Sequence, residues 1–157
     1  MSKLQKQRIL RWGLVIANML AIFLFSGQTG EDSGELSGLL AAILSKAVWL
    51  GWVFQYINIR KAAHFSIYFL LGIFTIRAVA LHTEQTKARI GAALLICFLY
   101  ACSDEFHQHF VPGRGPSFRD VLIDTAGALT SIGILTVVSW RRLKSSDKQV
   151  AAGQTFG

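Results

Sequence analysis

The sequence has few charged residues for its length. Lysine, arginine, aspartate and glutamate make up 16% of its 157 residues, whereas soluble domains contain about 25%. Hydrophobic residues make up 52%, and the mean hydropathy is +0.44. A lipid bilayer is therefore a better solvent for this chain than water. At roughly 20 residues per transmembrane helix, the length allows about four spans and leaves no room for a second folded domain.

Cysteine and proline are also scarce. Cys97 and Cys102 are the only cysteines, and their spacing of five residues places them on different faces of a helix. No disulfide between them is expected, and no Cys-x-x-Cys motif occurs. Both prolines, Pro112 and Pro116, lie in one short segment, where they predict a tight and stiff loop.

Four apolar segments are long enough to be transmembrane helices, namely residues 9–25, 62–81, 88–103 and 121–140. A fifth stretch, 36–57, has apolar residues at helical spacing around a central Lys46, which favours an amphipathic helix in the membrane interface over a span. We therefore predict an all-α polytopic membrane protein with four transmembrane helices and one interfacial helix. Residues 1–143 are expected to form a single membrane domain, followed by a disordered cytoplasmic tail at 144–157.

The positions of the basic residues predict the orientation. With four spans, the side that holds both termini has ten basic and two acidic residues, and the other side has five basic and seven acidic residues. Because cytoplasmic segments are rich in lysine and arginine, both termini and the loop at 82–89 are expected in the cytoplasm. The basic residues flank apolar segments and form no separate polar face, so nucleic acid is not an expected partner.

In this topology the unusual polar residues all lie on the extracytoplasmic side. Ionisable residues are costly within membrane spans and are therefore candidates for function. A histidine beside carboxylates can transfer protons, and arginines can hold phosphate or carboxylate oxygens. The candidate catalytic residues are His64, Asp104, Glu105 and His107. The candidate binding residues are Arg60, Lys61, Gln108, Arg114, Arg119, Asp120 and Asp124.

His64 lies one turn into an apolar span and needs a polar partner at the same depth. Asp104, Glu105 and His107 of the third span are the candidates. The charges at this end of the helices also suit a purely structural role, in which cations and anions pair and lock the helix ends together. A divalent metal is an alternative ligand, since histidine and carboxylates are a usable donor mix; the residues that could hold it are His64, Asp104, Glu105, His107, Asp120 and Asp124. No strict ligand spacing such as His-Glu-x-x-His occurs, so no metal site is assigned, and the sequence identifies no cofactor.

Several short motifs follow one another in order: Phe25-Ser26-Gly27-Gln28, Arg60-Lys61-Ala62-Ala63-His64-Phe65, Asp104-Glu105-Phe106-His107-Gln108, Pro112-Gly113-Arg114, and Asp120 with Asp124. Over residues 20–134 this series resembles the VanZ-like family of bacterial membrane proteins. The family usually has Ser-Ser-Gln where this chain has Ser26-Gly27-Gln28. The resemblance implies a protein of the bacterial cytoplasmic (inner) membrane and cell envelope. It also implies a founding relative linked to resistance to teicoplanin-type glycopeptide antibiotics.

Three functions are compatible with these residues. The first is hydrolysis of a lipid-anchored or cell-wall substrate by an activated water, because no serine or cysteine nucleophile stands out. The second is non-catalytic binding of a lipid headgroup, an antibiotic or an envelope partner. The third is a small proton-coupled transporter, which would need to dimerise because four spans are few. The expected partners are the bilayer and either a lipid-linked cell-wall precursor or a glycopeptide, and the oligomeric state is not predicted.

Overall fold

The computed structural model describes residues 1–28, 59–115 and 117–154. This part of the chain contains four helices, α1 (Lys3–Ser26), α4 (Ile59–Val79), α5 (Thr86–Gln108) and α6 (Phe118–Gln154). All four are long and apolar enough to cross a membrane, which confirms the predicted all-α fold with four spans. The interfacial helix predicted at 36–57 lies outside the described residues.

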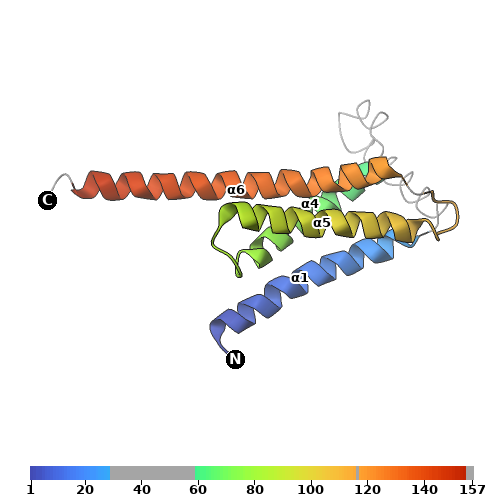
Figure 1. Ribbon diagram of the computed structural model, residues 1–157, viewed down its shortest axis with the longest axis horizontal. Coiled ribbons are helices and arrows are strands. Elements are labelled where there is room, and N and C mark those ends of the chain that lie inside the picture. Colours follow the sequence, from blue (N-terminus) through green and yellow to red (C-terminus); the bar gives the residue numbers. More distant parts are fainter. Residues whose placement is uncertain (29–58, 116, 155–157) are drawn as a thin grey trace, which may run out of the picture.

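The helices form a bundle with two distinct ends (Figure 1). Near the start of α1, Trp12 Nε1 donates a hydrogen bond to His82 Nε2 of the α4–α5 connection at 3.1 Å. At the opposite end, Arg114 of the α5–α6 connection donates to the carbonyl oxygen of Ser26 at 2.8 Å. The N-terminus therefore lies at the same end as the α4–α5 connection, and the end of α1 lies beside the α5–α6 connection.

Local signals account for the helix boundaries at the two ends of α1. Ser2 forms a capping box with Gln5, in which the Ser2 hydroxyl accepts from the Gln5 backbone N–H at 3.2 Å. In return, the Ser2 backbone N–H donates to Gln5 Oε1 at 2.8 Å. At the other end, the backbone N–H of Gly27 donates to the carbonyl oxygen of Phe23. These bonds satisfy backbone groups that have no partner within the helix.

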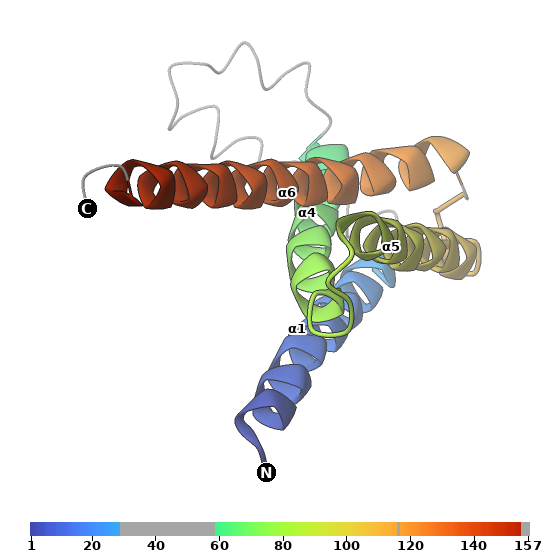
Figure 2. The same ribbon diagram turned by 60° about the vertical axis from the view of Figure 1, so that its left-hand side comes forward.

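Glycines let α4 and α6 cross at close range (Figure 2). A Cβ atom added to Gly72 of α4 would lie 2.7 Å from the carbonyl oxygen of Ala128 in α6. A Cβ atom added to Gly127 of α6 would overlap the carbonyl oxygen of Phe65 in α4. Real side chains do not tolerate such distances, so the two helices can approach this closely only where a side chain is missing. Small residues at helix crossings serve this purpose in membrane proteins.

The exterior of the bundle is apolar, as a lipid environment requires. Large apolar side chains are exposed along every helix, among them Ile16, Leu20, Leu70, Leu95, Leu99, Leu129 and Ile134. The interior contains a compact cluster built from Val15, Ile22, Tyr68, Leu71, Ala78, Cys97, Ala101, Val121 and Ala128. Buried polar residues also occur, and several of them gather at the end of the bundle where α1 ends and α6 begins.

The last helix is longer than the span of 121–140 predicted for it. α6 continues through Gln154, across most of the tail that is expected to be disordered, and extends beyond the other helices in Figure 1. The segment has no proline between Phe118 and Gln154 that would stop it. Lys144 also lies one turn after Trp140 and places its ammonium group 5.1 Å from the indole ring. Contacts at this spacing support a helix even where it packs against nothing else.

Candidate functional site

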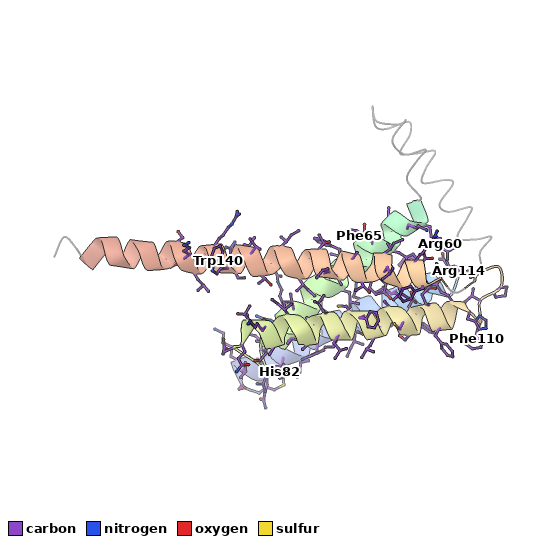
Figure 3. All side chains as sticks on the ribbon, turned by 45° about the horizontal axis from the view of Figure 1, so that its top comes forward. Arg60, Phe65, His82, Phe110, Arg114 and Trp140 are labelled. Atoms are coloured by element: carbon purple, nitrogen blue, oxygen red, sulfur yellow. The ribbon has the colours of Figure 1, made fainter. Side chains whose placement is uncertain are left out.

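The polar residues gather where one end of each of the four helices meets the α5–α6 connection. The C-terminal ends of α1 and α5, the first turns of α4 and α6, and the α5–α6 connection all lie at one end of the bundle. Figure 3 shows Arg60 and Arg114 at this end, whereas His82 lies at the opposite end. The polar residues that the topology predicts on one side of the membrane therefore lie at one end of the bundle.

A buried histidine–aspartate pair lies at the centre of this region. His64 Nδ1 of α4 is 3.4 Å from Asp124 Oδ1 of α6, within ion-pair distance but without hydrogen-bond geometry. The Asp124 side chain is fully buried, and 17% of the His64 side chain is exposed. Gly127, one turn after Asp124, makes this distance possible because it lets α6 approach the backbone of α4 at Phe65.

Asp104 of α5 is the third member of the cluster. Its Oδ2 atom accepts hydrogen bonds from Ser26 Oγ at 2.9 Å and from Gln108 Nε2 at 3.1 Å. Its Oδ1 atom has no hydrogen-bond partner among the described residues. His64, Asp104 and Asp124 each contribute one nitrogen or oxygen atom to a group of three atoms that lie within 4.8 Å of one another. We call these three residues the His–Asp–Asp cluster.

A small cavity of about 80 Å³ adjoins the cluster. Its lining residues come from the first turns of α4 and α6 and are Arg60, Lys61, His64, Asp120, Ile123 and Asp124. Lys61 Nζ is 3.7 Å from Asp120 Oδ1, so one cation of the cavity is close to an acid. The cavity therefore presents two basic side chains, a histidine, the carboxylate of Asp120 and the buried carboxylate of Asp124 to the same space.

A hydrogen-bond network connects the cavity to the other helices. Arg60 Nη2 donates to Gln108 Oε1 at 3.3 Å, and Gln108 in turn donates to Asp104. Ser26 closes the network, because its hydroxyl donates to Asp104 and its carbonyl oxygen accepts from Arg114. Burial lowers the pKa of Arg114 below its usual value, and the nearby Arg60 guanidinium lowers it further. Such a network holds each side chain in one orientation, which is a requirement for a chemically active site.

Glu105 and Arg114 hold the α5–α6 connection in place. Glu105 is buried, and its Oε2 atom accepts from the backbone N–H of Ser117 at 2.7 Å, immediately before α6 begins. The bond from Arg114 to the carbonyl oxygen of Ser26 fixes the same connection to the end of α1. Neither residue lines the cavity. Their contacts indicate a role in positioning α6 and, with it, Asp120 and Asp124.

His107 and Arg119 lie outside the cluster. The His107 ring packs on the Phe23 ring of α1, with 4.2 Å between ring centroids, and it does not line the cavity. Arg119 is exposed in the first turn of α6 and is likewise absent from the lining. Of the eleven sequence-predicted site residues, five therefore line the cavity and four take part in the surrounding hydrogen bonds, whereas His107 and Arg119 do neither within the described chain. The five are Arg60, Lys61, His64, Asp120 and Asp124, and the four are Asp104, Glu105, Gln108 and Arg114.

The sequence that contains the site matches a known protein family. The sequence model of the VanZ/LLP1 family matches residues 12–139, which include every residue of the cluster and the cavity. The chain belongs to the VanZ/LLP1 family. Comparison with curated proteins and with solved structures gives no match. Membership in the VanZ/LLP1 family confirms the resemblance inferred from the motifs and supports a multi-pass membrane protein.

Two buried residues of this VanZ/LLP1 protein were not among the predicted site residues. Ser26 bonds to both Asp104 and Gln108, and its place in the Phe25-Ser26-Gly27-Gln28 motif was the signal that could have identified it. Tyr68 lies one turn after His64 and is fully buried, and its hydroxyl has no hydrogen-bond partner in the described chain. The spacing of four residues from His64 was the corresponding signal for Tyr68.

Proposed function

We propose that this VanZ/LLP1 protein hydrolyses a lipid-anchored cell-envelope substrate with a phosphate-bearing headgroup, in the bacterial cytoplasmic membrane. Both termini lie in the cytoplasm, and the cavity opens at the extracytoplasmic side. The ten-to-five distribution of basic residues supports this orientation. So does the structure's grouping of the N-terminus with the α4–α5 connection at the end opposite the cavity.

One observation carries the proposal: a single cavity is lined by two basic side chains and by a buried histidine–aspartate pair. Arg60 and Lys61 supply the positive charge that phosphate oxygens require. The His–Asp–Asp cluster supplies groups that can take a proton from water. Binding and water activation are thus available within one enclosed space.

The size of the cavity favours a headgroup over a whole antibiotic. Sites for drug-sized ligands typically enclose about 300–1,000 Å³, whereas this cavity measures about 80 Å³. A volume of that size accommodates a phosphate group with a water molecule, because a water occupies about 30 Å³ in the liquid. The size of the cavity thus favours action on an envelope substrate over direct binding of a glycopeptide antibiotic.

The depth of the site also suits a lipid-anchored substrate. His64 lies in the second turn of α4, and Asp124 lies in the second turn of α6, close to the ends of both spans. At this depth a lipid phosphate can contact Arg60 and Lys61 without leaving the membrane. Water would then attack the phosphorus while the cluster takes a proton from the water. The P–O bond to the headgroup would break, and the proton would pass to the departing headgroup oxygen.

The experiment uses the full chain in proteoliposomes that contain a polyprenyl-diphosphate-linked cell-wall precursor. We expect the wild type to release the headgroup and His64→Gln to release it about 10²–10⁴-fold more slowly while still binding the lipid. Arg60→Gln is expected to weaken lipid binding. His82→Gln at the other end of the bundle is the matched control and should behave as the wild type.

Two results would count against hydrolysis. The first is no release by the wild type although the lipid binds, which would leave a non-catalytic headgroup-binding protein. The second is equal release by wild type and His64→Gln, which would mean that the cluster does not activate the water.

A further inference from the structure

We infer that the His–Asp–Asp cluster, His64, Asp104 and Asp124, is a binding site for one divalent cation of the zinc or manganese type. The sequence predicts no metal site, because the three residues lie on three different helices and show no ligand spacing. Only the folded bundle brings their nitrogen and oxygen atoms within 4.8 Å of one another.

The first argument is the state of the two carboxylates. Asp124 is fully buried, and its Oδ1 atom has only His64 Nδ1 near it, at 3.4 Å, while its Oδ2 atom has no hydrogen-bond partner among the described residues. Asp104 is 3% exposed, and its Oδ1 atom also has no partner there. Buried polar atoms are nearly always paired, and charged ones are especially costly to leave without a partner. Asp124 Oδ2 and Asp104 Oδ1 therefore point to a ligand that the cluster holds.

The second argument is charge. Two buried carboxylates close together, when both are ionised, carry more negative charge than one protonated His64 can balance. A single divalent cation between Asp104 and Asp124 balances both charges at once.

The third argument is how Asp104 is held. Ser26 and Gln108 both donate to its Oδ2 atom, at 2.9 Å and 3.1 Å, and thereby orient the carboxyl group. The Oδ1 atom is left for another partner. Metal-binding carboxylates in proteins are typically oriented by hydrogen bonds of this kind from neighbouring residues.

The donor set selects the kind of ion. One imidazole nitrogen and two carboxylate oxygens suit Zn²⁺ or Mn²⁺ better than Ca²⁺, which prefers oxygen ligands alone. Ligands about 2.1 Å from a zinc ion are at most about 4.2 Å apart, so three atoms that lie within 4.8 Å of one another can reach one ion with little movement. The cavity beside Asp124 leaves room for water as a further ligand.

This inference rests on the proposed function only for what the ion does. A bound Zn²⁺ or Mn²⁺ would lower the pKa of a coordinated water and so prepare it for attack on a phosphate. His64 would then be a ligand, and a carboxylate oxygen of the cluster would take the proton from the water. Cation binding is measured directly, so it can fail or succeed independently of hydrolysis.

The test is isothermal titration of the purified full chain in nanodiscs with ZnCl₂ and, separately, MnCl₂ after treatment with a chelator. We expect one ion per chain. Loss of a residue that supports a metal ligand typically weakens affinity roughly 10–100-fold, so His64→Gln and Asp124→Asn should weaken it at least that much. Ser26→Ala should have a smaller effect, within that range. The controls are His82→Gln and Glu84→Gln, since Glu84 is fully exposed at the other end of the bundle.

Thermal unfolding of the unmodified chain covers the case in which a variant does not fold. The inference predicts that Zn²⁺ or Mn²⁺ raises the unfolding temperature and that Ca²⁺ does not. The inference is overturned if the wild type binds no ion and gains no thermal stability. It is also overturned if folded His64→Gln and Asp124→Asn bind the ion as tightly as the wild type does. Headgroup release by a wild type that binds no ion would overturn the metal site and leave the proposed hydrolysis intact.

Discussion

Replacing Gly127 by alanine tests how the site is assembled. Gly127 lies where α6 meets the backbone of α4, and an added methyl group would overlap the carbonyl oxygen of Phe65. Because Phe65 follows His64 and Gly127 comes three residues after Asp124, separating the helices here also separates the histidine from the aspartate. The variant should therefore lose both stability and cation affinity.

The magnitude follows from a comparison within the same helix. Gly133 also lies in α6, but a Cβ atom added there would have no neighbour within 4 Å. Both alanine variants gain helix propensity of about 0.5–1 kcal/mol, and this gain cancels when the two are compared. What is left is the cost of overpacking at Gly127, about 1–3 kcal/mol.

The assay is reversible unfolding of both variants in mixed detergent micelles, followed by circular dichroism. We expect Gly133→Ala to be at least as stable as the wild type. The free energy of unfolding of Gly127→Ala should be about 1–3 kcal/mol lower than that of Gly133→Ala. Equal free energies of unfolding for the two variants would refute the claim that Gly127 sets the distance between α4 and α6.

Two further predictions concern the network and the orientation. Ser26→Ala removes the hydroxyl that donates to buried Asp104, so the free energy of unfolding should fall by about 1.5–3 kcal/mol. Ser103→Ala, which removes an exposed hydroxyl, should change the free energy of unfolding by less than about 0.5 kcal/mol. An equal loss of stability in Ser26→Ala and Ser103→Ala would contradict a stabilising role for the network. In a chain without Cys97 and Cys102, Ser117→Cys should react with a membrane-impermeant thiol reagent added outside the cell. Labelling only from the cytoplasmic side would reverse the orientation.

The four spans were predictable because each has enough consecutive apolar residues to cross a bilayer, whatever it packs against. Helix ends were less predictable. The last helix continues past residue 144 because no proline or other strong breaker stops it, and hydropathy carries no information about a helix outside the membrane. The common depth of His64 and Asp104 followed from topology alone, since spans that alternate in direction bring specific ends together.

Contacts between helices could not be predicted in the same way. The partner of His64 was expected on the third span, at Asp104, Glu105 or His107, but the nearest acid is Asp124 of α6. Which faces meet depends on Gly127, and its role is visible only once α4 and α6 are packed. His107 illustrates the converse, because its spacing from Asp104 suggested a site residue and the rotation of α5 places its ring against Phe23.

The central claim is that the buried cluster around His64 carries the function of this VanZ/LLP1 protein. The most direct measurement compares cells that produce the wild type, His64→Gln or His82→Gln, scored for an envelope phenotype such as glycopeptide susceptibility and for protein abundance in the membrane. The amide of glutamine does not titrate near neutral pH and cannot replace the imidazole. We predict that His64→Gln accumulates normally but loses function, whereas His82→Gln keeps it. Full function of His64→Gln at normal abundance would contradict the claim.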